Sequence, residues 1–244
     1  MNTVIIGDVH NRVDLVCKIL NRHQNSQFIF IGDYFDSFTD DVAVAKHTAM
    51  WLKDSLQQSN RIHLWGNHDV QYAFGMANLR VTGYTRDKEE IISEVMTHED
   101  WSRLKFFHAQ DDWWFSHAGI TAQWFEHPVH GLTQSSIERE IKLAERDLAS
   151  RRLPMSLCSY DDMGDNPAGI GGLLWVRWNR LDCIPGVKQI VGHTQCERVS
   201  YKRDTGGTNI NIDCLHKEYV VINDSNEVVV VSTQTGETTT TLQC

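Results

Sequence analysis

The amino-terminal part of the sequence repeats one pattern, a short apolar segment that ends in glycine and is followed by a side chain able to bind a metal. The apolar segments are residues 3–6, 28–31 and 62–65. The side chains that follow their glycines are Asp8, Asp33 and Asn67. Helical periodicity separates the segments, over residues 13–20 and again over 42–56. Strands that alternate with helices predict a parallel sheet with right-handed connections, so these polar side chains should meet at one edge of that sheet.

The same pattern recurs later in the chain, with histidine in place of the carboxylate. A strand predicted at residues 113–115 leads to His117, and one at 189–191 leads to His193. A capping box at Ser135–Glu138 predicts the start of a helix between them. Four strands separated by turn residues are predicted after His193, at 199–202, 209–213, 219–223 and 228–231. We therefore expect a mixed α/β chain whose carboxyl-terminal part is antiparallel.

Two polar stretches contain no recognisable motif. Residues 73–110 are predicted to be helical, and the charged run Arg86–Glu90 within them is interpreted as a solvent-facing helical surface. The acidic, glycine-rich stretch Asp161–Gly172 matches neither a calcium loop nor a nucleotide-binding loop. It is either a cover over a site or a plain surface loop. We expect residues 73–110 and Ser150–Gly172 to border the substrate cleft.

Composition limits the classes of function. The chain has 244 residues, a net charge of −9 and a pI of about 5.7, which argues against a broad basic face for duplex nucleic acid. We expect neither a secretory signal nor a membrane span, and we interpret the six cysteines as reduced thiols of a cytoplasmic protein. Because no linker or repeat divides the sequence, we predict one domain over residues 1–244, with a polar tail that frays from about residue 233.

Six side chains at the predicted strand ends offer oxygen or imidazole ligands. They are Asp8, His10, Asp33, Asn67, His117 and His193. A set without thiolate suits Mn, Fe, Zn or similar ions rather than a structural zinc site. So many ligands exceed what one ion with an open position needs, but they fit two ions about 3.5–4 Å apart that share a carboxylate. Such a pair can hold the attacking and leaving oxygens of a displacement at phosphorus.

Five ordered motifs resemble those of the calcineurin-like metallophosphoesterases. They are Gly7–His10, Gly32–Asp36, Gly66–Asp69, His117–Gly119 and Gly192–Thr194. Two further stretches, Leu173–Arg177 and Asn211–Asp213, are similar to the phosphoprotein phosphatase branch. That branch includes bacterial and bacteriophage serine/threonine phosphatases and symmetrical diadenosine tetraphosphatases. The resemblance covers nearly the whole chain and implies a four-layer α/β/β/α sandwich with two mixed sheets.

The resemblance also implies a role for each matched residue. Asp8 and His10 would bind the first metal, Asp33 would bridge both metals, and Asn67, His117 and His193 would bind the second. A hydroxide that bridges the metals would attack phosphorus directly. His68 would donate a proton to the leaving oxygen, while Asp36 would orient His68 and favour its charged form. Arg177 would bind phosphate oxygens through its planar guanidinium.

The sequence departs from the phosphatase pattern at the second motif. Ser37 and Phe38 stand where that motif has an arginine after Asp36. We predict that Arg12, just behind the first motif, replaces that arginine in binding phosphate. Gly192–Thr194 also lacks the second histidine of the nuclease and cyclic-nucleotide branches, which favours phosphomonoester or dinucleotide-polyphosphate substrates.

We predict a metal-dependent phosphomonoester hydrolase similar to serine/threonine protein phosphatases, with two divalent ions, Mn²⁺ before Fe, Zn or Ni. A symmetrical dinucleoside polyphosphate hydrolase is the alternative enzyme. A non-catalytic module that binds a phosphorylated ligand is the alternative from another class. Trp175 and Trp178 flank Arg177, so one of them could line the cleft, while Asp213 either turns a loop or orients a ligand histidine.

Overall fold

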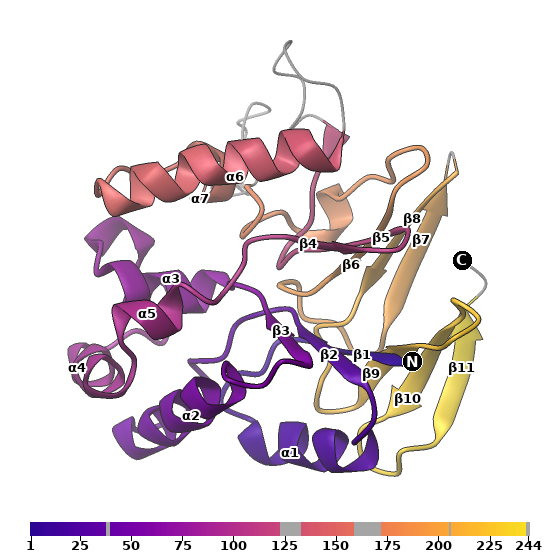
Figure 1. Cartoon of the computed structure of the whole chain (residues 1–244), viewed down its shortest axis with the longest axis horizontal. Helices are drawn as coiled ribbons and strands as arrows, with labels where there is room; N and C mark the ends of the chain where they lie inside the picture. The colour runs from indigo at the N-terminus through magenta and orange to yellow at the C-terminus, as the bar shows by residue number, and fades with distance from the viewer. Residues whose placement is uncertain (38–39, 123–132, 159–171, 205, 243–244) are drawn as a thin grey trace.

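Two mixed sheets form the centre of the molecule (Figure 1). The computed structural model describes residues 1–37, 40–122, 133–158, 172–204 and 206–242. The strand order is β11-β10-β9-β1-β2-β3 in the first sheet and β4-β5-β6-β8-β7 in the second. The predicted α/β class with two mixed sheets is therefore confirmed.

The first sheet contains the predicted β-α-β-α-β unit. Its strands are β1 (Thr3–Ile6), β2 (Gln27–Phe30), β3 (Arg61–His63), β9 (Glu218–Ile222), β10 (Val228–Ser232) and β11 (Thr238–Leu242). The strands β1, β2 and β3 are parallel, and they are connected by helices α1 (Val13–Arg22) and α2 (Val42–Ser55). The prediction of a frayed tail is wrong, because β11 pairs antiparallel with β10.

The second sheet places three parallel strands between two antiparallel edges. Its strands are β4 (His108–Gln110), β5 (Trp113–Phe115), β6 (Lys188–Val191), β7 (Ser200–Asp204) and β8 (Gly207–Asn211). The strands β5, β6 and β8 are parallel, whereas β4 and β7 pair antiparallel with β5 and β8. The edge strand β4 lies at the end of a stretch predicted to be helical, and it has only three residues.

The remaining helices surround the sheets. They are α3 (Asn67–Phe74), η1 (Ala77–Leu79), α4 (Arg86–Val95), α5 (His98–Trp101), α6 (Gln134–Ala149), α7 (Met155–Cys158) and η3 (Trp178–Arg180). The cap of α6 is Thr133, two residues before the predicted capping box. The stretch 159–171, which contains most of the predicted acidic loop, lies outside the described residues. Within the described ranges no helix is long and apolar enough to cross a bilayer, and the five cysteines are free thiols.

Alternation along the strands separates two apolar faces of the first sheet. Ile5 and Ile29 point to the second sheet, where they meet Phe115 and Ile190. Their neighbours Val4, Ile6, Phe28 and Phe30 belong to the cluster that packs with α1 and α2. Figure 1 shows α1 and α2 outside the first sheet and α6 beyond the second. The two sheets thus pack face to face, and the loops that leave their parallel strands lie along a common edge.

Candidate active site

The candidate site lies where the parallel strands of both sheets end. The loops after β1, β2 and β3 carry Asp8, Asp33 and Asn67, and the loops after β5 and β6 carry His117 and His193. Four side chains of the site stand on left-handed backbone: His10 at φ 42°, Asp33 at 51°, Asp36 at 63° and His193 at 66°. Residues other than glycine rarely adopt this conformation, and it concentrates at functional sites.

Two groups of side chains could each hold a metal ion, and they share one carboxylate. The ligand atoms of Asp8, His10 and Asp33 lie within 4.8 Å of one another, and so do those of Asp33, His117 and His193. Asn67 joins the second group, because its Oδ1 lies 2.8 Å from His117 Nε2 and 3.0 Å from His193 Nδ1. The structure therefore brings together all six ligands predicted from the sequence.

Backbone contacts fix how two of the histidines face the shared carboxylate. His10 Nδ1 lies 3.1 Å from the carbonyl oxygen of Phe35, and His117 Nδ1 lies 3.0 Å from that of Ile31. A ring nitrogen that donates to a carbonyl leaves the other nitrogen free to bind a metal. The Nε2 atoms of these histidines lie 3.8 and 3.4 Å from Asp33 Oδ2. Both rings therefore face the Asp33 carboxylate, which the two ligand groups share.

Two glycines make room for the carboxylates. A Cβ atom on Gly66 would lie 2.1 Å from Asp33 Oδ1, and one on Gly192 would lie 1.9 Å from Asp8 Oδ1. Any other residue at these positions would displace the carboxylate that it meets. This close approach explains physically why glycine precedes Asn67 and His193 in the sequence pattern.

Asp69 is a supporting residue that the sequence interpretation did not assign to the site. It is fully buried, and its carboxylate accepts hydrogen bonds from the backbone N–H groups of Gly66 (2.8 Å), Asp33 (2.9 Å) and Tyr34 (2.8 Å). Asp69 therefore ties the loop after β2 to the loop after β3. Its place in the third motif was the signal that could have identified it.

The buried charges of the site fit divalent cations. Burial raises the pKa of Asp8, and the neighbouring Asp213 and Asp33 raise it further. Burial also raises the pKa of Asp213, to about 6. The pKa of His193 is lowered to about 3, by burial first and then by His117, so this imidazole is neutral. Buried carboxylates beside neutral imidazoles are the donor set that a divalent ion both binds and neutralises.

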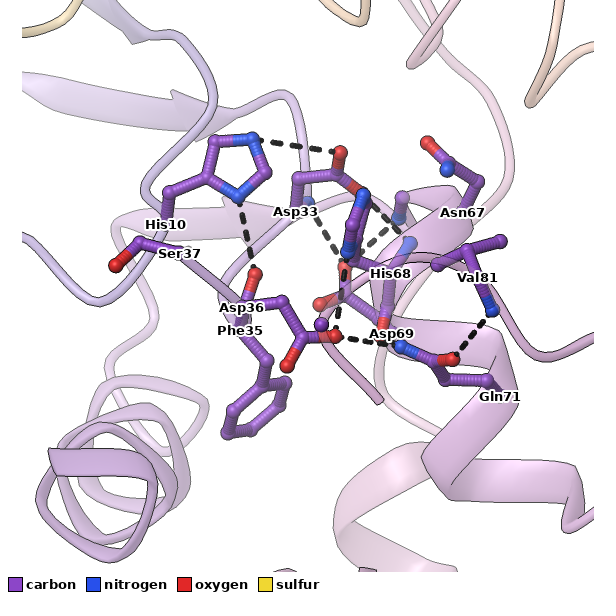
Figure 2. A network of polar contacts seen from close by, with 12 residues as sticks. His10, Asp33, Phe35, Asp36, Ser37, Asn67, His68, Asp69, Gln71 and Val81 are labelled. Carbon is purple, nitrogen blue, oxygen red and sulfur yellow. Dashed lines mark hydrogen bonds and ion pairs between the residues drawn. The ribbon is translucent and has the colours of Figure 1, made fainter. Parts of the chain in front are cut away.

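His68 and Asp36 form a pair beside the shared carboxylate of Asp33 (Figure 2). His68 Nδ1 lies 3.2 Å from Asp36 Oδ2, and the backbone N–H of His68 donates to Asp33 Oδ1 at 2.9 Å. Burial lowers the pKa of His68, but Asp33 and Asp36 oppose it more strongly, so the net pKa is raised. An imidazolium held this way can donate a proton near neutral pH.

The interpretation of Arg86–Glu90 as a solvent-facing surface is wrong for one residue. Lys88 is only 4% exposed, and its ammonium pairs with Asp36 at 3.2 Å. The other charged residues of this run are exposed or half-buried, as predicted. Lys88 lies four residues before the buried Ile92, on the same face of α4, and this spacing was the signal that could have placed it inward.

The pair and the ligand groups open into one cleft of about 440 Å³. Both predicted phosphate-binding residues line it, Arg12 half-buried and Arg177 exposed, together with Ser37. Trp175 also lines the cleft, whereas Trp178 packs its ring against the Lys202 ammonium, 4.6 Å from the ring centroid.

Several residues outside the motifs also line the cleft. Val81, Thr82 and Gly83 come from the stretch 73–110, which was expected to border the cleft, whereas Gln195 and His216 were not predicted to line it. Asp213, for which the sequence left two interpretations open, lines the cleft, and His10 and Arg12 lie close enough to lower its pKa.

Comparisons with solved structures agree with this architecture. A cold-active protein-tyrosine phosphatase of a psychrophilic Shewanella species is 19% identical, with 99% of this chain and 80% of that chain covered and a TM-score of 0.66. A protein serine/threonine phosphatase from Saccharomyces cerevisiae is 12% identical, with 100% and 81% covered and a TM-score of 0.54. At these identities the likeness shows a shared fold. No curated protein sequence matches the chain.

The family is shown by the sequence itself. Residues 1–197 match the calcineurin-like phosphoesterases, and this range contains all six candidate ligands as well as His68 and Asp36. A match of this extent, together with the fold and the two ligand groups, establishes the class of enzyme. The chain belongs to the calcineurin-like phosphoesterases and is a phosphoesterase.

Proposed function

We propose that the protein hydrolyses phosphomonoesters with two divalent metal ions, in the manner of serine/threonine protein phosphatases. The observation that carries this proposal is the pair of ligand groups that share Asp33, with the His68–Asp36 pair beside them in one cleft. A shared carboxylate is what two closely spaced ions require. A proton donor next to them is what a poor leaving oxygen requires.

The six candidate ligands are proposed to hold the ions. Asp8, His10 and Asp33 would hold one, and Asp33, Asn67, His117 and His193 the other. When bound, two such ions supply a hydroxide near neutral pH and offset the negative charge of the phosphoryl group. We propose Mn²⁺ as the working ion, because oxygen and imidazole ligands suit it, with Fe, Zn or Ni as other ions of this set.

The residues of the chain would complete the reaction. His68 donates its proton to the leaving oxygen, and Asp36 accepts from His68 Nδ1, which keeps the ring oriented. Arg177 binds non-bridging phosphate oxygens at the mouth of the cleft, and Arg12 takes the place of the arginine that Ser37 replaces. No covalent bond between phosphate and the protein is needed.

A symmetrical dinucleoside polyphosphate hydrolase is the second candidate. Two arginines and a tryptophan line the cleft, namely Arg12, Arg177 and Trp175. Several phosphates in a row need more than one cationic side chain, and a nucleobase can stack on an indole.

A cytoplasmic location is proposed as well, and the free thiols of the described cysteines support it.

The test is hydrolysis by protein stripped of metal and then supplied with Mn²⁺. The substrates are an aryl phosphate, phosphoserine and phosphotyrosine peptides, diadenosine tetraphosphate and a bis-aryl phosphodiester. Asp33→Asn and His68→Ala are measured in parallel, with Asp54→Asn on the exposed face of α2 as the control. We expect Asp33→Asn to lose about 10³-fold or more, since metal stabilisation of the transition state is several kcal/mol.

The outcomes separate the candidates. Turnover of the peptides that depends on Mn²⁺ and is lost in Asp33→Asn supports the phosphatase proposal. Faster turnover of the dinucleotide than of either peptide supports the second candidate instead. Hydrolysis of the diester alone, or hydrolysis that does not respond to metal, contradicts both.

A further inference from the structure

Lys88 is a buried lysine at the back of the candidate active site. It lies on α4, and its side chain is 5% exposed while that of Asp36 is 1% exposed. Its ammonium donates to Asp36 Oδ1 at 3.2 Å and to the carbonyl oxygen of Gly83 at 2.9 Å. A lysine is almost never buried this deeply without a charged partner, so the pair with Asp36 is the reason for its position.

Four side chains together fix the orientation of Asp36. Its Oδ2 lies 2.6 Å from Gln71 Nε2 and 3.2 Å from His68 Nδ1. Its Oδ1 lies 2.7 Å from the Tyr72 hydroxyl and 3.2 Å from Lys88 Nζ. Among these four donors, only Lys88 has a side chain that is positively charged whether or not His68 is protonated. It contacts Asp36 Oδ1, whereas His68 contacts Oδ2. A carboxylate with two donors on each oxygen cannot rotate without breaking some of them.

The segment 81–88 packs tightly on Asp36 and also forms a wall of the cleft. A Cβ atom on Gly83 would lie 2.8 Å from Asp36 Cβ. Val81 N–H donates to Gln71 Oε1 at 2.9 Å, and Gln71 in turn holds Asp36 (Figure 2). Val81 and Gly83 line the cleft itself. The lysine thus joins a segment far along the sequence to the proton-donating pair.

We propose that Lys88 is a positioning residue, whose ammonium holds the Asp36 carboxylate in the orientation that Asp36 needs to support His68. The proposal rests on the proposed function, in which His68 protonates the leaving oxygen. Lys88, which lies outside the motifs, would thus contribute to protonation of the leaving oxygen. Lys88 is buried and is not among the residues that line the cleft, so it would act through Asp36 rather than directly on the substrate.

The role of Lys88 can be isolated by changing the leaving group. An alkoxide released from phosphoserine needs a proton, whereas a nitrophenolate is a stable leaving group that needs little help. A residue that positions the proton donor should therefore affect alkyl phosphates far more than nitrophenyl phosphate. A residue that merely stabilises the fold should affect both substrates equally.

The central variant is Lys88→Met, which keeps the length of the side chain but removes its charge. We expect kcat for a phosphoserine peptide to fall about 10–100-fold, because general acid catalysis contributes about 10²–10⁴-fold. For nitrophenyl phosphate we expect a fall of less than about threefold, with Mn²⁺ affinity unchanged. Lys88→Arg, which keeps the charge, should recover much of the peptide activity.

Two further variants separate positioning from stability. Lys88→Met leaves Asp36 as a buried carboxylate without its lysine, so it can destabilise the protein. The double variant Lys88→Met with Asp36→Asn removes both charges and should recover stability while peptide activity stays low. Lys53→Met is the matched control, because Lys53 also pairs with a buried carboxylate, Asp100 at 3.4 Å, on other helices. We expect both substrates to respond alike to that change.

Crystal structures of wild type and Lys88→Met give a readout that does not depend on turnover. We expect the distance between His68 Nδ1 and Asp36 Oδ2 to lengthen from 3.2 Å to beyond a hydrogen bond in the variant. An unmoved Asp36, or equal losses on the two substrates, would overturn the proposal. If wild type hydrolyses no phosphomonoester, the proposed function fails, and the crystal structures still decide whether Lys88 positions Asp36.

Discussion

The two sides of the cleft are built in different ways. On the side proposed to bind metal (the metal side), Asp8, Asp33 and Asn67 follow three neighbouring parallel strands, so the sheet itself brings them together. On the side proposed to donate the proton (the proton-donor side), Asp36 is held by side chains of α3 and α4, including the buried Lys88. The first arrangement follows from topology, whereas the second depends on individual long-range contacts. A single substitution should therefore affect one side without the other.

The largest effect is expected at Asp69, which supports the metal side. Asp69→Ala removes the acceptor of three buried N–H groups, those of Gly66, Asp33 and Tyr34. An unsatisfied buried donor costs about 1–3 kcal/mol, so we expect the free energy of unfolding to fall by about 3 kcal/mol or more. Urea denaturation measures the change. Asp54→Ala on exposed α2 is the control, with an expected change within about 0.5 kcal/mol; equal effects of the two changes would contradict this role of Asp69.

Substitutions at two glycines, Gly66 and Gly83, test the two sides of the cleft separately. In Gly66→Ala the new Cβ would lie 2.1 Å from Asp33 Oδ1, so we expect Mn²⁺ affinity to fall about 10–100-fold. In Gly83→Ala it would lie 2.8 Å from Asp36 Cβ, so we expect Mn²⁺ affinity to change less than about twofold while phosphoserine turnover falls about tenfold. Calorimetry and steady-state kinetics measure the two quantities.

Backbone strain needs its own control in this comparison. Gly83 has φ +95°, and Gly186 has φ +76° with nothing within 4 Å of its added Cβ. Gly186→Ala therefore introduces strain without a contact. If Gly186→Ala lowers phosphoserine turnover as much as Gly83→Ala does, the contact with Asp36 is not the cause. If Gly83→Ala lowers metal affinity as well, the two sides of the cleft are not separable.

The smallest expected effect is on the pH dependence of stability. It arises from His63, whose pKa is shifted in the opposite direction to that of the nearby His68. His63, on β3, bonds to the Tyr34 hydroxyl and the Ser55 hydroxyl, and burial first and Arg61 second lower its pKa to about 3. His68 has a raised pKa because Asp33 and Asp36 outweigh its burial. Below about pH 6.5 the unfolded chain therefore binds a proton at His63. The folded chain does not bind this proton until the pH falls to about 3.

This difference at His63 predicts how stability depends on pH. Because the unfolded state binds the extra proton, stability falls as pH decreases, by about 1.4 kcal/mol for His63 alone at pH 5.5. His63→Gln removes the proton-binding group and should make the urea midpoint less dependent on pH between 7.5 and 5.5. An unchanged pH dependence would mean that His63 is already exposed or charged in the folded protein.

The sequence predicted which side chains come together at the strand ends, because strand-end motifs report what a parallel sheet brings together. Asp8, His10, Asp33, Asn67, His117 and His193 were all placed within two ligand groups. Lys88 was missed, because a buried lysine is not expected without a charged partner and its partner lies 52 residues away in the sequence. The strand β11 was missed for a similar reason: its threonines are mostly exposed, and its pairing with β10 is set by a partner strand rather than by a local apolar pattern.

The left-handed backbone of His10, Asp33, Asp36 and His193 has a consequence for how this protein can evolve. Residues other than glycine held in this conformation cost of order 1–3 kcal/mol each. The rest of the fold must offset that cost, so the native state is less stable than the same architecture with a relaxed site. Adaptation toward higher temperature would meet a trade-off between stability and activity at these positions. Substitutions that relax the backbone there would stabilise the fold but would move the side chains of the site apart. Such adaptation is expected to proceed through the surface and the two apolar cores, while these four positions stay strained.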